Sequence, residues 1–463
     1  MATEAPGAEG TAGVRSAPLT LALAIAVATV LADSSVVVLA LPDLLSALHV
    51  SIERVAWVIT AFNLALALAA LPAAQLAARA GAARVTCAGL AGFALASAVC
   101  TVAGSIDVLL AARVVQAVFG AAVVCGALAL LPKLAGTQAR GLAVWAAAAA
   151  AGAAAGPAAG GALTQAFTWR GVFAAQVPLA LVPLALLVHG RVRDPERTAG
   201  GRVWPRPWPN LALALVSAAL TAALFLLVLM LVRGWGLDPL AAAAVLSVIP
   251  VAAIATSAFL KPAATAPAPV AAGVILIAGG LAALALVPSA AVVWTLVPQA
   301  LIGAGLALTL PGLTHTALAG AGPAAIHGGW TIAARHAGVV IGLVILTPIF
   351  TTDLVTQQAA AERSGTSLVL NSKLSLDAKL RLGDAIDRSL HQTQNRLPDL
   401  RPAFRAQHPS AADRPTYEQL RAALTGQVRR AATHAFSRAF LVAAGIALLA
   451  LAALAPGWRE AAT

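Results

Sequence analysis

Charged residues are scarce in this sequence. Only 10% of the 463 residues are Asp, Glu, Lys or Arg, 60% are hydrophobic, and the mean hydropathy is +0.88. Because soluble globular domains carry about 25% charged residues, this composition excludes that class and indicates an integral membrane protein. The sequence contains no recognisable nucleotide-binding loop, which argues against ATP as an energy source. We do not expect the protein to be an enzyme.

Cysteine is nearly absent as well. Cys87, Cys100 and Cys125 all lie in apolar stretches and show no metal-ligand spacing, so we interpret them as small core residues. His315, His327 and His336 also lack ligand-like spacing. The sequence therefore predicts no metal site.

Apolar runs dominate the chain. A helix needs about 20 apolar residues to cross the hydrocarbon core of a bilayer, and twelve windows of roughly this length recur. We predict an all-α integral membrane protein with twelve transmembrane helices in two six-helix bundles. The spans fall at about 19–42, 55–77, 85–104, 107–131, 141–165, 171–190, 210–232, 239–260, 268–288, 291–318, 326–350 and 436–456.

Basic residues gather in alternate loops between these spans, for example around Arg79, Lys133 and Arg202. The positive-inside rule places such loops in the cytoplasm, together with both termini. The net charge of +12 is thus explained by basic loops that lie beside the lipid bilayer. We therefore expect no nucleic acid as a partner. The abundance of alanine and arginine is typical of GC-rich bacterial genes, so the bacterial plasma membrane is the expected location of this multi-pass protein.

Polar segments set the domain limits that we predict. A segment with five arginines divides the two bundles, and a longer charged segment precedes the last span. The predicted units are a cytoplasmic tail (1–18), the N-terminal six-helix bundle (19–190), a cytoplasmic linker (191–209), five helices of the C-terminal bundle (210–350), an extracytoplasmic helical insert (351–435), the last transmembrane helix (436–457) and a cytoplasmic tail (458–463).

The insert shows helical spacing of apolar residues at Leu376, Leu380, Ile386 and Leu390. A second helix is expected to begin near Pro415 and to run directly into the last span. The insert is either a tolerated surface addition or a helical lid over the outer vestibule, and it is also a possible site for an extracytoplasmic partner.

Asp33 is the only carboxylate well inside a predicted span. It lies roughly 14 Å from the outer end of its helix, and Arg113 lies roughly 9 Å from the outer end of its own. The two depths allow an ion pair. Such a pair can have either of two roles. It carries a proton if the carboxylate takes one up when the pair opens, or it simply holds two helices together.

Several segments together resemble one family. They include "LADSSVVVLALPDL" with Asp33, "AWVITAFNLALALAALPAAQLA", "LLAARVVQAVFGAA" with Arg113 and Gln116, and "WRGVFAAQVP" with Gln176. The stretch "GAAAGPAAGG" adds Gly152, Gly156, Pro157, Gly160 and Gly161. In this order, these segments are similar to the drug:proton antiporters of the major facilitator superfamily.

The resemblance implies a secondary transporter that exports a small molecule in exchange for protons by alternating access, without a cofactor. It implies proton coupling through Asp33 and Arg113, and close helix packing along the glycine-rich fifth span. Candidates for lining the substrate cavity are Asn63, Gln116, Gln176, His315 and Arg335.

One loop departs from the family pattern. The gate loop after the second span keeps Arg79, Gly81 and Arg84, but Ala78 stands where the family has an aspartate. The resemblance implies that this aspartate belongs to a charge network that latches the cytoplasmic gate. Its absence puts the strength of that latch in doubt.

With one carboxylate against two arginines and several histidines in the spans, the cavity is expected to be neutral to positive once Asp33 is protonated. A buried cation needs an acidic partner, so we predict neutral or anionic amphipathic substrates. Two other functions stay open: a translocase for lipids or lipid-linked sugars, and a non-transporting scaffold or sensor that uses the insert.

Overall fold

A computed structural model describes residues 8–190, 192, 204–260, 267–318, 324–391, 403–404 and 413–462 of the chain. Throughout these residues the regular structure is helical, and they form no strand. Eleven of the helices are long and apolar enough to cross a membrane.

Five of those helices form the first half of the molecule. Side-chain caps set three of their starts, because Ser51, Ser105 and Thr137 each accept a backbone N–H from the first turn of the helix that follows. Gly81 joins two of the helices with a φ of 110°, which favours glycine. The helices are α1 (Ala8–Ala47), α2 (Ile52–Ala80), α3 (Ala82–Val102), α4 (Ile106–Leu134) and α5 (Gln138–His189).

α5 contains two membrane spans. Its 52 residues would extend about 78 Å, far more than the hydrocarbon thickness of about 30 Å. Phe167 and Thr168 leave helical geometry, and a Cβ on Gly171 would lie 3.1 Å from the carbonyl oxygen of Leu163. These two residues would be about 12 Å apart in a straight helix. The chain therefore reverses here, and the prediction of twelve spans is confirmed.

The second half begins near the predicted seventh span. Its helices are α6 (Pro207–Leu229), which continues into a π-helical turn η1 (Met230–Gly234), then α7 (Pro239–Leu246), α8 (Val248–Phe259), α9 (Pro267–Ala285), α10 (Val293–Leu318), α11 (Ala324–Leu370), α12 (Leu376–His391) and α14 (Arg414–Ala462). α7 and α8 together make up one span, Pro239–Phe259.

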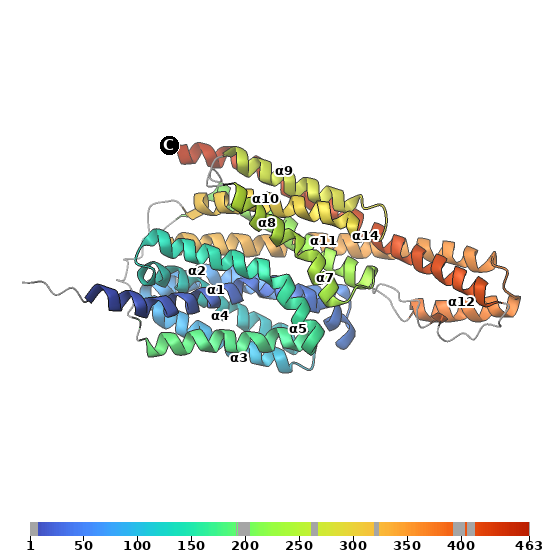
Figure 1. Ribbon diagram of the computed structural model, residues 1–463, viewed down its shortest axis with the longest axis horizontal. Coiled ribbons are helices and arrows are strands. Elements are labelled where there is room, and N and C mark those ends of the chain that lie inside the picture. The colour runs from blue at the N-terminus through green and yellow to red at the C-terminus, as the bar shows by residue number, and fades with distance from the viewer. Residues whose placement is uncertain are drawn as a thin grey trace, which may run out of the picture.

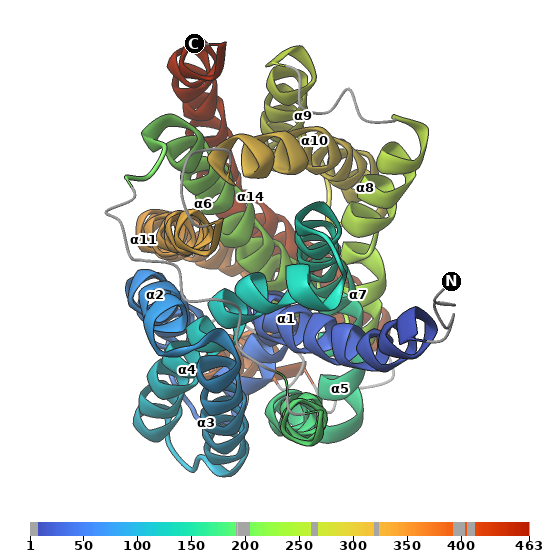
Figure 2. The same ribbon diagram turned by 90° about the vertical axis from the view of Figure 1, so that its left-hand side faces the viewer.

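The two halves lie side by side and meet along two seams. α1 to α5 occupy the lower part of Figure 2, and α6, α8 to α11 and α14 occupy the upper part. The most extensive contacts between the halves join α2 to α11 and α5 to α7. This arrangement confirms the two-bundle fold that the sequence predicts.

The insert is built from helices that leave the bundle. α11 continues without a break from the predicted span to Leu370, and α14 enters the last span from Arg414, so the two helices project together beyond the bundle with α12 beside them (Figure 1). They share a small apolar core of Val369, Leu374, Leu382, Phe404, Tyr417, Leu420 and Leu424. Both ends of the described chain lie on the opposite side of the molecule from this projection (Figure 1).

The domain limits stay predictions. Residue 191 and residues 193–203 of the linker, and residues 392–402 and 405–412 of the insert, lie outside the described residues. In the described part, α6 begins three residues before the predicted start of its unit, at Pro207.

Candidate functional site

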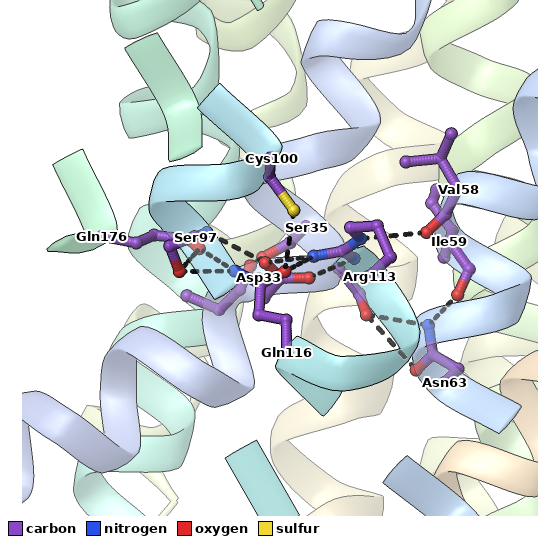
Figure 3. A network of polar contacts seen from close by, with 12 residues as sticks. Asp33, Ser35, Val58, Ile59, Asn63, Ser97, Cys100, Arg113, Gln116 and Gln176 are labelled. Atoms are coloured by element: carbon purple, nitrogen blue, oxygen red, sulfur yellow. Dashed lines mark hydrogen bonds and ion pairs between the residues drawn. The ribbon is translucent and has the colours of Figure 1, made fainter. Parts of the chain in front are cut away.

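Asp33 and Arg113 form a fully buried ion pair inside the first half. Asp33 comes from α1 and Arg113 from α4, and both side chains have an exposed fraction of 0%. Arg113 Nη1 donates to Asp33 Oδ1 at 2.8 Å, and Nη2 donates to Oδ2 at 2.5 Å. This two-pronged geometry is the strongest form of the arginine–carboxylate contact. Asp33 and Arg113, which the sequence places at similar depths, are thus in direct contact (Figure 3).

Three neutral polar side chains complete the surroundings of the pair. Gln176 in α5 donates to Asp33 Oδ1 at 2.9 Å. Gln116, one turn along α4 from Arg113, accepts from Nη1 of Arg113 at 2.6 Å and donates to Gln176 Oε1 at 2.6 Å. It also donates to the Ser97 hydroxyl of α3 at 2.7 Å. The carboxylate is therefore part of a polar network that joins α1, α3, α4 and α5 of the first half (Figure 3).

Arg113 keeps contacts that do not depend on Asp33. Its Nε donates to the carbonyl oxygen of Val58 in α2 at 3.1 Å. The guanidinium carbon lies 4.1 Å from the ring centroid of Phe62 and 5.6 Å from that of Phe173, within cation–π range. With Gln116 as a further acceptor, the cation retains partners if the carboxylate becomes neutral.

Glycines of α5 bring α1 close to this site. A Cβ at Gly152 would collide with the carbonyl oxygen of Ala28, one at Gly156 with the hydroxyl of Ser35, and one at Gly160 with the carbonyl oxygen of Val36. Gly161 faces the other way and meets Pro239 and Ala243 of α7, and Pro157 is buried among these glycines. The glycine-rich segment therefore packs on α1 around Asp33 and reaches the second half.

We expect Gly156→Ala to destabilise the protein by about 1–3 kcal/mol, because the added Cβ would also lie 2.8 Å from the Cβ of Ser35. The matched control is Gly279→Ala on α9, where no atom lies within 4 Å and no loss of stability is expected. Thermal unfolding of the two purified variants checks this. Equal melting temperatures would contradict the role of Gly156 in packing.

A second polar cluster links the two halves. His336 Nδ1 of α11 lies 2.6 Å from Oδ1 of Asn63 in α2. Asn63 Nδ2 donates to the carbonyl oxygen of Ile59 at 2.8 Å and to the Ser34 hydroxyl at 3.0 Å. Because the Ile59 oxygen only accepts, the amide orientation is fixed, and neutral His336 must carry its hydrogen on Nδ1. Since Ser34 follows Asp33, this cluster joins the ion pair to the second half.

The other predicted site residues lie apart from this network. His315 is exposed in the last turn of α10, and Arg335 is partly exposed on α11. In the gate loop Arg79 is exposed, and Arg84 donates to the carbonyl oxygen of Ala80 at 3.4 Å. Neither arginine forms an ion pair within the described parts of the chain. The roles assigned to these residues stay predictions.

Sequence reasoning did not find Ser97 and Ser34. Each is a lone hydroxyl in an apolar run, which is a weak signal because a serine in a membrane helix often bonds to its own backbone. Ser97 does this as well, donating to the carbonyl oxygen of Phe93 at 2.7 Å. Only the packing of α3 against α4 and α5 shows that Ser97 also accepts from Gln116.

Known proteins resemble this chain in sequence. The tetracenomycin C resistance and export protein of Streptomyces glaucescens is 31% identical over 236 residues, which is 50% of this chain and 42% of that protein. The multidrug efflux pump LfrA of Mycolicibacterium smegmatis is 31% identical over 38% of this chain and 36% of its own length. The probable multidrug resistance protein EmrY of Escherichia coli is 28% identical over 37% of this chain and 35% of its own length. Each match covers less than half of the relative.

Solved structures resemble the fold. A bacterial homologue of the human lysosomal transporter Spinster, in an inward-facing and unoccupied conformation, aligns with a TM-score of 0.61 at 15% identity, covering 96% of this chain and 98% of that one. The peptide transporter POT aligns with a TM-score of 0.57 at 12% identity, covering 71% of this chain and 87% of that one. These likenesses concern the fold alone.

The family itself is shown by sequence. Residues 23–347, which include every helix that supplies the polar network, match the family described as Major Facilitator Superfamily. This family match supports the prediction of a membrane transporter. With its twelve spans in two bundles, the chain belongs to the Major Facilitator Superfamily.

Proposed function

We propose that this transporter is a proton-coupled antiporter that exports a neutral or anionic amphipathic small molecule by alternating access. The observation that carries the proposal is the buried pair of Asp33 and Arg113, whose charges lie at 0% exposure within the membrane-spanning helices. Relatives named for resistance to and export of tetracenomycin C and for multidrug efflux or resistance support efflux as the direction of transport.

Asp33 would carry the proton. A carboxylate without a cation or water is very unfavourable in a low-dielectric interior, so separation from Arg113 would drive Asp33 to take up a proton. Re-formation of the pair would release it. Arg113 would meanwhile keep the Val58 carbonyl, Gln116 and the Phe62 ring as partners, which lowers the free energy of the opened state.

Opening or closing of the Asp33–Arg113 pair would be transmitted to the second half through neighbouring contacts. Ser34 follows Asp33 in α1 and accepts from Asn63, which in turn accepts from His336 of α11. A shift of α1 that opens the pair would therefore also disturb the contact between α2 and α11. Rocking of two helical bundles about a central site is the usual form of alternating access in such folds.

The proposed energy source is the proton gradient, with no cofactor. One proton entering across about 100 mV supplies about 2.3 kcal/mol, enough for a single carboxylate to drive a modest substrate gradient. The proposed setting is a bacterial plasma membrane with both termini in the cytoplasm. The insert would then lie outside the cell.

Proteoliposomes test this function directly. Vesicles with an interior more acidic by about one pH unit are offered two probes, tetracenomycin C and 8-anilinonaphthalene-1-sulfonate (ANS). We expect about tenfold accumulation of at least one probe, because one pH unit corresponds to about 1.4 kcal/mol per proton. Nigericin, which collapses the gradient, should abolish it. Accumulation that persists with nigericin, or none of either probe, would contradict the proposal.

A further inference from the structure

Within the described part of the chain, Arg335 is a cation without a counter-charge. It lies on α11 next to His336, at the depth where α11 meets the middle of α2. Its guanidinium forms no hydrogen bond and no ion pair with any residue in the described ranges, and its side chain is only partly buried. A charge at this depth is costly unless it faces water or a ligand.

The spacing along α11 shows which way Arg335 faces. Seven residues make nearly two full helical turns, so Arg335 shares a face with Gly328, where an added Cβ would meet Leu128 of α4. His336 likewise shares a face with Gly329, which meets α2. Val344, nine residues and two and a half turns beyond Arg335, is 54% exposed. Gly342, seven residues beyond Arg335, packs against Ala218 of α6. Arg335 therefore lies on the inner side of α11, between α4 of the first half and α6 of the second half, and the opposite side of α11 faces outward.

The charges in the spans favour an anion as the missing partner. Asp33, the only carboxylate deep in the predicted spans, is fully engaged by Arg113 and Gln176. The hydrogen on His336 Nδ1 is likewise engaged by Asn63. Arg335 thus presents up to five free N–H donors toward the centre of the molecule, and no acid of the described chain pairs with them.

We propose that Arg335 is the anion-binding residue of the substrate site and selects amphipathic organic acids, such as carboxylates, sulfonates or phenolates. The inference rests on the proposed function and makes it more specific. The acid group of the substrate binds the guanidinium on the inner side of α11, and its apolar body lies against the alanine-rich and leucine-rich helix faces. A lipid headgroup is not the expected source of the anion, because Arg335 lies on the face of α11 turned away from the bilayer.

A matched pair of probes tests the proposal. ANS and N-phenyl-1-naphthylamine share one aromatic skeleton and differ by the sulfonate. Their dissociation constants are measured by fluorescence titration of the full-length protein in nanodiscs made only of phosphatidylcholine, which removes anionic lipid as a competitor. Empty nanodiscs give the background. We expect wild-type protein to bind ANS more tightly than the neutral probe.

Arg335→Gln should weaken ANS binding about 10-fold or more, since a charge-assisted contact is worth about that factor, and should change binding of the neutral probe less than twofold. Arg335→Lys keeps the charge and should retain part of the preference. The matched control is Arg363→Gln, which removes an exposed arginine from the same helix and should change neither constant.

Unchanged ANS affinity in Arg335→Gln, an equal loss for both probes, or no wild-type preference for ANS would each overturn the proposal. These outcomes are separable from failure of antiport. If tetracenomycin C still accumulates in proteoliposomes in a nigericin-sensitive way, the antiport function stands and only the anion-binding role of Arg335 falls.

Discussion

Asparagine in place of Asp33 is expected to abolish uphill transport driven by a pH gradient, while exchange of substrate between equal concentrations continues. Asparagine keeps the shape of the side chain and an oxygen that accepts from Arg113 and Gln176, but it has no proton to exchange near neutral pH. If one proton is exchanged for each substrate, wild-type protein should accumulate substrate about tenfold per pH unit in proteoliposomes. Asp33→Asn should not accumulate it. Counterflow of labelled substrate measures the remaining exchange.

The matched control is Asp384→Asn, which removes an exposed carboxylate from α12 and should leave accumulation unchanged. Loss of both accumulation and counterflow in Asp33→Asn would indicate that the residue holds the fold or the substrate instead of carrying a proton. Unchanged accumulation would remove Asp33 from the coupling mechanism altogether.

Removal of Arg113 should have the largest effect on stability. Arg113→Leu leaves a carboxylate at 0% exposure without its cation, and breaking a buried pair from one side costs about 3–5 kcal/mol. Adding Asp33→Asn to the same chain removes the unmatched charge, so the double variant should recover most of that loss. Unfolding free energies of wild type, both single variants and the double variant give the coupling between the two residues.

The expected coupling in this cycle is at least about 2 kcal/mol, near the upper end for residues that share one network. Additive losses, with no recovery in the double variant, would contradict the structural account of the pair. Recovery of stability without recovery of antiport is the specific result that we expect, because the double variant folds but lacks the proton carrier.

The sequence predicts those features that depend on hydropathy and depth. Twelve apolar runs, the polar division between bundles and the helices of the insert are visible in it, and the residue numbers of Asp33 and Arg113 place both at similar depths. The chain reversal at Phe167 and Thr168 is also foreshadowed, since the spans predicted on either side leave a short break there.

Features that depend on how helix faces meet are not visible in the sequence. The Gln116 and Ser97 contacts need the rotation of α3 and α4 about their axes, and the His336 contact to Asn63 needs the two halves to be docked. The apolar core of the insert shows the same limit. Leu376 and Leu380 match a helical period, yet both are exposed, whereas Leu382 is buried. Periodicity thus predicts the helix but not which side finds a partner.

His315 illustrates a further limit. A histidine in an apolar run suggests a polar cavity, but His315 lies in the last turn of α10 and is exposed there. Near a helix end a side chain with a polar tip reaches the membrane interface, so position along the helix competes with composition as a guide to function.

Proton release on substrate binding tests the central claim most directly. Purified protein in weakly buffered solution near neutral pH receives a saturating amount of the compound that accumulates in proteoliposomes, and a pH-sensitive dye records the protons that appear. We predict that substrate favours the closed pair of Asp33 and Arg113, and that each wild-type molecule in which the pair was open therefore releases about one proton. Asp33→Asn should release none. Equal release from both proteins would show that Asp33 is not the proton carrier.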